Sequence, residues 1–121
     1  MGRGRSDELK ERTKKFGLSV IELVEGLPRT KAADVLGRQL LRAATSVGAN
    51  YRAACRARSQ ADFVSKIGVV EEEADESGYW LELLLEAAIG DGAEVTRLLK
   101  VANELTAIFT ASGRTARQRT P

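Results

Sequence analysis

Residues 56–78 read RARSQADFVSKIGVVEEEADESG, and this stretch decides the fold of a 121-residue chain. It contains a turn near Arg58 and a capping-box-like Ser59-Gln60-Ala61-Asp62, a pattern typical of a helix N-terminus. After the turn, apolar residues recur at intervals of three and four, the period of an amphipathic helix. Lys and Arg dominate the charged positions before the turn, whereas Asp and Glu dominate those after it. The stretch therefore predicts two long helices of opposite charge joined by a tight turn.

The rest of the chain has the same helical period, and no segment alternates apolar and polar residues over the length of a strand. This pattern predicts an all-α fold, an antiparallel four-helix bundle with short loops. The helices are expected at about 7–26, 31–57, 60–88 and 92–112, with Ser6, Thr30, Ser59 and Asp91 as N-caps. The bundle then occupies residues 7–112. We expect residues 1–6 to be disordered and residues 113–121, with three arginines and no carboxylate side chain, to form a flexible basic tail.

The composition excludes several classes of protein. No apolar run is long and uncharged enough to span a membrane, and the basic start of the chain is followed by no apolar segment of the kind a secretory signal needs. We therefore expect a cytoplasmic protein with no membrane partner. The single cysteine, Cys55, excludes an intramolecular disulfide, and its Ala-rich surroundings favour a small core residue over a reactive thiol.

Histidine is absent from the chain. Its absence excludes Ser-His-Asp and Cys-His nucleophile systems, zinc sites with histidine ligands, and the Glu-x-x-His iron sites of other helical bundles. There is also no Gly-rich phosphate loop. We predict that the protein is not an enzyme, with no catalytic residue, no metal site and no cofactor.

The expected third helix carries two apolar stripes. The first, which includes Phe63, faces the core, and the second, displaced by about 100° of arc, contains Val69, Trp80 and Leu83. Either the helix is buried between two neighbours of its own bundle, or the second stripe enters a subunit interface, because exposed apolar patches usually mark contacts. The pattern alone leaves both open.

Carboxylates occupy much of the remaining surface of this helix. The spacing of Glu72 and Glu76 allows a general acid/base or metal hypothesis, but a solvated acidic face is the simpler interpretation without histidine. Glu73 differs because it falls between the two apolar stripes. It should be partly buried and paired with a cation.

The second helix carries a basic stripe within about 80° of arc, opposite its apolar face. The stripe consists of Lys31, Arg38, Arg42, Arg52 and Arg56. Between Arg38 and Arg56 it would extend about 27 Å, long enough to follow several phosphates. Arginine suits phosphate and carboxylate equally, so the stripe can bind nucleic acid or pair with acidic faces of other helices or subunits. An exposed stripe would support nucleic-acid binding. A stripe buried against Glu72 and Asp75 would support pairing with acidic faces.

Several motifs together resemble the four-helix-bundle family encoded in intervening sequences of 23S ribosomal RNA genes. They are RAATSVGANYRA at residues 42–53, Arg58-Ser59 followed by Asp62-Phe63, EEEADE at residues 71–76, and YWLE at residues 79–82. The resemblance implies an up-down-up-down bundle that assembles as a ring, typically a pentamer. The family is similar to the accessory subunit of diversity-generating retroelements, a pentameric bundle that binds nucleic acid and a reverse transcriptase.

The residues and the resemblance together lead to two hypotheses. In the first, the protein is a non-catalytic homo-oligomer that binds RNA or DNA through phosphate contacts of the basic stripe, with help from the arginines of the tail. In the second, it is a structural scaffold or an adaptor for a protein partner such as a reverse transcriptase, and the basic stripe serves subunit or partner contacts. Under both hypotheses the second apolar stripe is expected at the oligomer interface.

Overall fold

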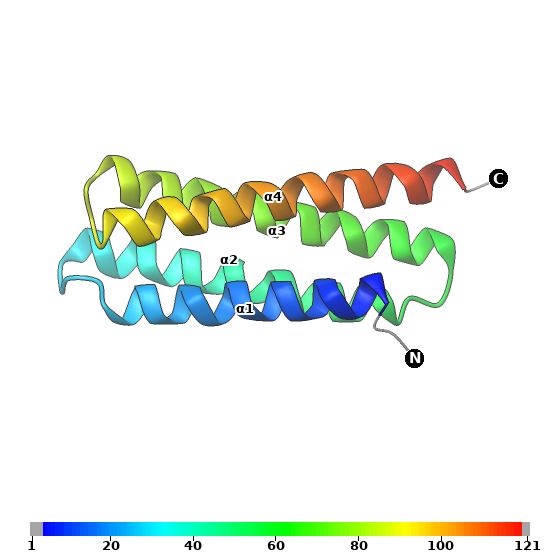
Figure 1. Cartoon of the computed structure of the whole chain (residues 1–121), viewed down its shortest axis with the longest axis horizontal. Coiled ribbons are helices and arrows are strands. Elements are labelled where there is room, and N and C mark those ends of the chain that lie inside the picture. Colours follow the sequence, from blue (N-terminus) through cyan, green and yellow to red (C-terminus); the bar gives the residue numbers. More distant parts are fainter. Residues whose placement is uncertain (1–3, 120–121) are drawn as a thin grey trace.

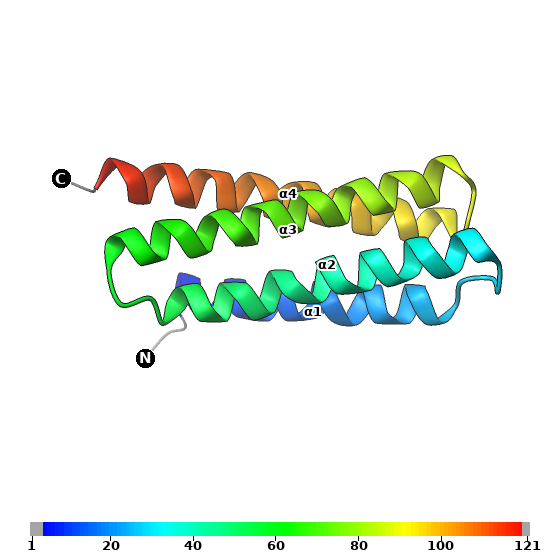
Figure 2. The same cartoon turned by 180° about the vertical axis from the view of Figure 1, so that it is seen from behind.

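The computed structural model describes residues 4–119 and has the predicted fold. Its helices are α1 (Arg5–Glu25), α2 (Lys31–Cys55), α3 (Gln60–Glu86) and α4 (Gly92–Gln118), and residues 4–119 contain no strand. The helices run up-down-up-down along one long axis (Figures 1 and 2). Each helix packs against its neighbours in sequence, and α4 closes the bundle on α1 with the smallest contact of the four. The all-α four-helix bundle is therefore confirmed.

Three of the four predicted N-caps are present. The side chains of Thr30 and Ser59 accept hydrogen bonds from the backbone N–H groups of Ala33 and Asp62, both at 3.1 Å. Asp91 Oδ1 accepts from Ala93 N at 3.1 Å and Glu94 N at 3.4 Å. Each of these bonds satisfies a backbone donor that has no partner within its helix, which is why α2, α3 and α4 begin where they do.

The first helix begins two residues earlier than predicted. Gly4, and not Ser6, is the N-cap of α1, which begins at Arg5. The prediction that residues 1–6 are disordered was therefore wrong for residues 5 and 6, and residues 1–3 lie outside the described range.

The prediction that residues 113–121 form a flexible basic tail was also wrong over most of this range, because α4 continues to Gln118. Ser112-Gly113 resembles a helix stop, but Gly113 is buried where its absent side chain lets α4 approach Ile67 of α3. One turn later, Ala116 is buried and its carbonyl accepts from Gln60 Nε2 at 2.9 Å. Packing on α3 thus extends the helix. Residues 120–121 lie outside the described range.

The core lies along the bundle axis and draws on all four helices. Phe16 of α1, Leu40 of α2, Leu81 of α3 and Phe109 of α4 are among its fully buried side chains. Full burial of each such side chain contributes roughly 1.5–3 kcal/mol. Tyr51 is also buried, with its ring 5.3 Å from that of Phe109. Cys55 lies at the edge of this core, half-buried.

Helices α1 and α2 approach closely through small residues. A side-chain carbon on Gly48 would lie 3.4 Å from Thr13 Oγ1, and one on Gly17 would lie 3.9 Å from the backbone of Ala44. Gly17 would weaken an isolated helix. Here it allows close packing between α1 and α2.

Candidate nucleic-acid interface

Charge is separated along the long axis of the bundle. One end combines the start of α1, the α2–α3 turn and the end of α4, on the right in Figure 1. It comprises residues 5–15, 46–70 and 107–119, which hold twelve Lys and Arg against four Asp and Glu, a net charge of +8. The other end, residues 16–45 and 71–106, holds six Lys and Arg against thirteen Asp and Glu, a net charge of −7. We call these the basic end and the acidic end.

The five residues of the predicted basic stripe are all exposed, but the charge separation divides them. Lys31 and Arg38 belong to the acidic end, where Arg38 pairs with Asp34 one turn earlier in α2 (Nη2–Oδ2 2.7 Å). Arg52 and Arg56 belong to the basic end and form no ion pair within residues 4–119. The stripe is therefore not one uniform surface. Among the described residues, its cations without an ion pair are Lys31 at the acidic end and Arg52 and Arg56 at the basic end.

Arg42, at the middle of the stripe, faces α3. Its Nη1 lies 3.3 Å from Glu73 Oε2, and its Nη2 pairs with Glu76 Oε2. The Glu73 side chain is only 17% exposed, so the prediction of a partly buried and paired carboxylate is confirmed. Glu76 Oε2 also accepts from Trp80 Nε1 at 3.0 Å. Arg42 thus binds α2 to α3, which is the structural use of a basic residue that the sequence left open.

A groove between α1 and α2 continues the basic surface from Arg52. It has a volume of about 510 Å³, and its charged lining residues are three cations, Lys10, Lys14 and Arg52, and one carboxylate, Glu11. At its other end lie Leu18 and Ile21, two exposed apolar side chains, of which Leu18 is 56% exposed. The groove therefore presents cations beside an apolar surface.

The second apolar stripe of α3 is only partly at the surface. Val69 is 41% exposed, whereas Trp80 and Leu83 are half-buried, and Trp80 packs against the core. The neighbouring Tyr79 is 52% exposed, and its ring lies 5.1 Å from that of Trp80. The assignment of Val69, Trp80 and Leu83 to an oligomer interface stays a prediction, and the side chain most open to a partner here is Tyr79.

The acidic surface of α3 is open to solvent. Glu72 and Asp75 are both exposed, so they do not cover the basic stripe in this protomer. Glu71 instead accepts from Thr110 Oγ1 of α4 at 2.6 Å. Within residues 4–119, no three His, Cys, Asp or Glu side chains are placed to hold a metal ion together.

Two ionisable groups at the basic end have shifted pKa values. Lys66 Nζ donates to Asp62 Oδ1 at 2.6 Å and the Arg58 N–H donates to Oδ2 at 3.2 Å, and these bonds lower the pKa of Asp62. Burial raises the pKa of Tyr51, and a hydrogen bond with Cys55 adds to this effect. Asp62 is therefore a carboxylate engaged with its neighbours, and Tyr51 keeps its proton at neutral pH.

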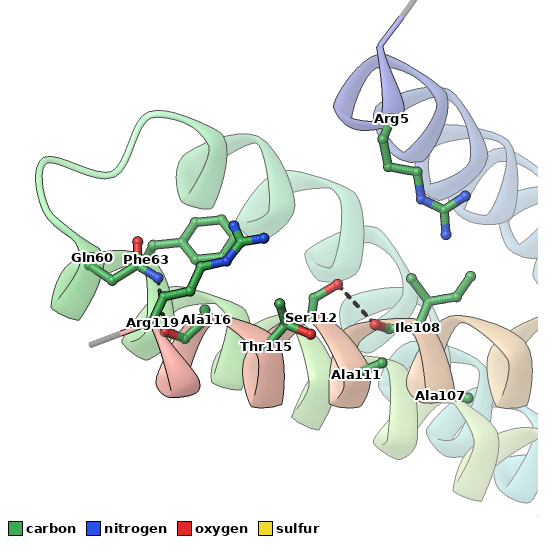
Figure 3. Close-up of a pocket in the computed structure, with 10 residues that line it drawn as sticks. All are labelled: Arg5, Gln60, Phe63, Ala107, Ile108, Ala111, Ser112, Thr115, Ala116 and Arg119. Carbon is green, nitrogen blue, oxygen red and sulfur yellow. Dashed lines mark hydrogen bonds between the residues drawn. The ribbon is translucent and has the colours of Figure 1, made fainter. Parts of the chain in front are cut away.

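A cavity of about 720 Å³ opens at the basic end among α1, α3 and α4, and the α1–α4 contact is the smallest helix–helix contact of the bundle. Phe63 of α3 and Ile108 of α4 form its apolar wall with three alanines of α4. Arg5 extends into the opening from α1, and Arg119, the C-cap residue that follows α4, also lines the cavity (Figure 3). An adjoining cavity of about 610 Å³ shares Arg5 and Phe63 with it.

Sequence reasoning missed three cations of this surface, Arg5, Lys10 and Lys14, and it expected Arg119 to help bind nucleic acid only as part of a flexible tail. Lys10 and Lys14 are four residues apart and lie on one face of α1, a spacing that the sequence already offered. Arg5 and Arg119 were assigned to segments expected to be disordered. Only the packing of α4 on α3 and the early start of α1 place them at a cavity.

Comparison with known proteins identifies the family. Residues 6–111 match the model of the 23S rRNA-intervening sequence protein family. The chain belongs to this family. A structure similar to this chain is the 1.70 Å crystal structure of a protein with unknown function from the S23 ribosomal protein family, from Bacteroides thetaiotaomicron. The two share 28% sequence identity with a TM-score of 0.82, over 92% of this chain and 99% of the other. A comparison with curated proteins finds no match.

None of the helices within the described residues is both long enough and apolar enough to cross a membrane.

Proposed function

We propose that this member of the 23S rRNA-intervening sequence family is a non-catalytic homo-oligomer that binds RNA or DNA at its basic end. The observation that carries the proposal is the net charge of +8 on one end of the bundle, against −7 on the other. Such a separation creates a directed field that attracts a polyanion to one end and repels it from the other. The exposed cations of the α1–α2 groove and the α2–α3 turn then contact phosphates.

Phosphate contacts position a nucleic acid without reading its sequence. Binding should therefore tolerate many sequences and weaken steeply as salt is added, because each neutralised phosphate releases counterions. A ring of subunits would repeat one modest site several times and raise the avidity without any new contact. Support for assembly comes from the family resemblance, which favours a pentamer, and from the exposed apolar side chains of Leu18, Val69 and Tyr79.

The absence of catalysis belongs to the same proposal. Glu72 and Asp75 lie on an open helix face, where water surrounds a substrate and no preorganised group orients a nucleophile. Arg52 and Arg56 lie at the surface as well. Such groups suit electrostatic binding.

The test is a titration of fluorescently labelled RNA and DNA at several salt concentrations. The basic-end variant carries Lys14→Glu, Arg52→Glu and Arg56→Glu. Its control carries Lys31→Glu, Arg38→Glu and Lys100→Glu, an equal change of charge at the acidic end. We expect the basic-end variant to bind more than about tenfold more weakly at about 50 mM salt, and the control to change by less than about threefold.

Arg42 is left unchanged in both variants because its pairing with Glu73 supports the fold. Two results would reject the proposal. One is that the wild-type protein binds no nucleic acid at about 50 mM salt, where phosphate contacts are strong. The other is that both variants lose affinity equally, because the effect would then reflect total charge and not the basic end.

The competing function is a scaffold or protein adaptor, and one contact favours it. Arg42 pairs with α3 carboxylates and is not free for phosphate. In that case the exposed cations would contact acidic faces of a partner or of neighbouring subunits. The same titration separates the two, since an adaptor would show no salt-dependent binding of RNA or DNA.

A further inference from the structure

The cavity at the basic end has features that phosphate contacts alone do not explain. Its volume of about 720 Å³ lies within the range of pockets that hold small organic groups. Its wall is apolar, with Phe63, Ile108 and three alanines, whereas the residues at its opening include two arginines. A phosphate-binding surface needs the arginines but gains nothing from the apolar wall. The combination suits a ligand with a flat apolar body flanked by negative charge.

Phe63 is held in place by the start of α3. Its backbone N–H donates to the carbonyl of the capping residue Ser59 at 3.0 Å, so it lies in the first turn of the helix. The side chain is half-buried and forms part of both adjoining cavities at the basic end. The sequence assigned Phe63 to the core stripe. The structure places its ring at the edge of the core, where a planar group can stack on it.

The polar groups of the cavity are few and oriented. Gln60 Nε2 is fixed by its bond to the Ala116 carbonyl at 2.9 Å, and the Ser112 hydroxyl donates to the Ile108 carbonyl at 2.9 Å (Figure 3). This bond engages one of the two amide N–H groups, so Gln60 can offer a ligand its second N–H as a donor and its amide oxygen as an acceptor. That acceptor suits the exocyclic amino group that three of the four bases carry, and it does not restrict the site to one base.

We propose that this cavity holds one unstacked base of a single-stranded nucleic acid, with the base on Phe63 and its flanking phosphates on Arg5 and Arg119. The inference rests on the proposed function and makes it more specific, from polyanion binding to binding of single strands. Bases in a duplex are stacked inside the helix and cannot enter a side cavity, whereas single strands can present them to an aromatic side chain. The protein should therefore prefer single strands and strand ends over blunt duplexes.

The experiment compares two labelled DNA strands of equal length, one of mixed sequence and one with every base replaced by an abasic sugar. Both carry the same phosphates, so only the bases differ. We expect the wild-type protein to bind the strand with bases about 5- to 150-fold more tightly, the range of base stacking on an aromatic side chain. Phe63→Leu should reduce this ratio to less than about threefold and leave binding of the abasic strand unchanged.

A second variant fills the cavity from α4. Ala111 is an exposed residue of α4 that lines the cavity, and Ala111→Leu should also abolish the preference for bases. Its matched control is Ala93→Leu, the same change on an exposed position at the other end of α4. The control should keep the wild-type ratio. Helical circular dichroism and thermal melting of each variant check that the bundle is intact.

The outcomes separate this inference from the proposed function. If the wild-type protein binds both strands equally, or if Phe63→Leu keeps the preference, the base site is wrong and electrostatic binding stands. If it binds neither strand, both the proposed function and the base site are wrong. A preference for bases that both cavity variants lose and Ala93→Leu keeps would establish the site.

Discussion

Arg42 joins the two middle helices of the bundle. Its guanidinium contacts Glu73 and Glu76 of α3, and Glu76 in turn holds the indole N–H of Trp80. Arginine suits this role because its planar fork can bind two carboxylates at once, which the point charge of a lysine cannot do as well. The contact brings a cation to the half-buried Glu73, whose charge would otherwise be poorly compensated.

The first prediction removes this charge and keeps the side chain's apolar stem. Arg42→Met should lower the free energy of unfolding by about 1–2 kcal/mol, because Glu73 loses its partner in a half-buried position. Its control is Arg38→Met, which removes the exposed ion pair with Asp34 within α2 and should cost less than about 0.5 kcal/mol. Urea unfolding followed by circular dichroism measures both.

A double variant shows whether the loss of stability in Arg42→Met comes from its ion pair with Glu73. Adding Glu73→Gln to Arg42→Met removes the uncompensated charge and should recover part of the lost stability. If Arg42→Met and Arg38→Met cost the same, the contact between α2 and α3 has no special role.

At the scale of the element, the turn after α3 is unusual. Ala88 adopts φ 55°, and the N–H groups of Ala88 and Ile89 donate to the carbonyls of Leu85 and Leu84. This is the Schellman motif, in which glycine is the usual residue at the left-handed position. The predicted end of the helix at residue 88 was late by two residues because alanine there suggests a continuing helix. Gly90 supplies the second positive φ of the turn, 87°.

The second prediction follows from these two dihedral angles. Ala88→Gly should raise the free energy of unfolding by about 0.5–1 kcal/mol, because glycine adopts the left-handed region without the steric cost that alanine carries. Gly90→Ala should lower it by at least about 1 kcal/mol, since its new side-chain carbon would also lie 2.8 Å from Leu27 Cδ2.

Thermal or urea unfolding measures both variants. Ala88→Gly should raise the free energy of unfolding, and Gly90→Ala, two residues later, should lower it. Equal and small effects of the two changes would mean that the turn is not held in this conformation in solution.

At the scale of the whole molecule, the bundle has exposed apolar side chains on two different faces. The outer face of α3 presents Val69 and Tyr79, and α1 presents Leu18 and Ile21. Two different apolar patches favour contacts between unlike faces of neighbouring copies, and such contacts form a ring when the rotation between copies closes. A closed ring is also the assembly that the family resemblance implies.

The third prediction concerns assembly. We expect multi-angle light scattering to give a mass several times the 13.1 kDa of the chain, with a pentamer as the expected state. Val69→Lys with Tyr79→Lys should reduce this mass, because both side chains are exposed and their replacement leaves the core intact. The originally predicted Trp80 and Leu83 are half-buried, so their substitution would also destabilise the protomer.

The control for assembly is Ala93→Lys, which adds charge on another exposed helix position. It should leave the mass unchanged. A wild-type mass near 13 kDa at micromolar concentration would contradict the prediction.

The sequence by itself determined the fold class, the helix order and most helix starts. Periodicity suffices for this because the apolar positions of each helix must face one core, and side chains such as Thr30, Ser59 and Asp91 cap their helices through local bonds. The partial burial of Glu73 also followed from its angular position alone. These features depend on residues near one another in the chain.

Only the tertiary structure decided where charge accumulates. Arg42 and Arg52 belong to one stripe of α2 in the sequence, but the first pairs with α3 and the second stays free because different helices lie opposite them. The last turns of α4 form because Gly113 and Ala116 pack on α3, and the local sequence does not predict this packing. The basic end combines three segments distant in sequence, so its net charge of +8 and its cavity arise only when the antiparallel topology brings them together.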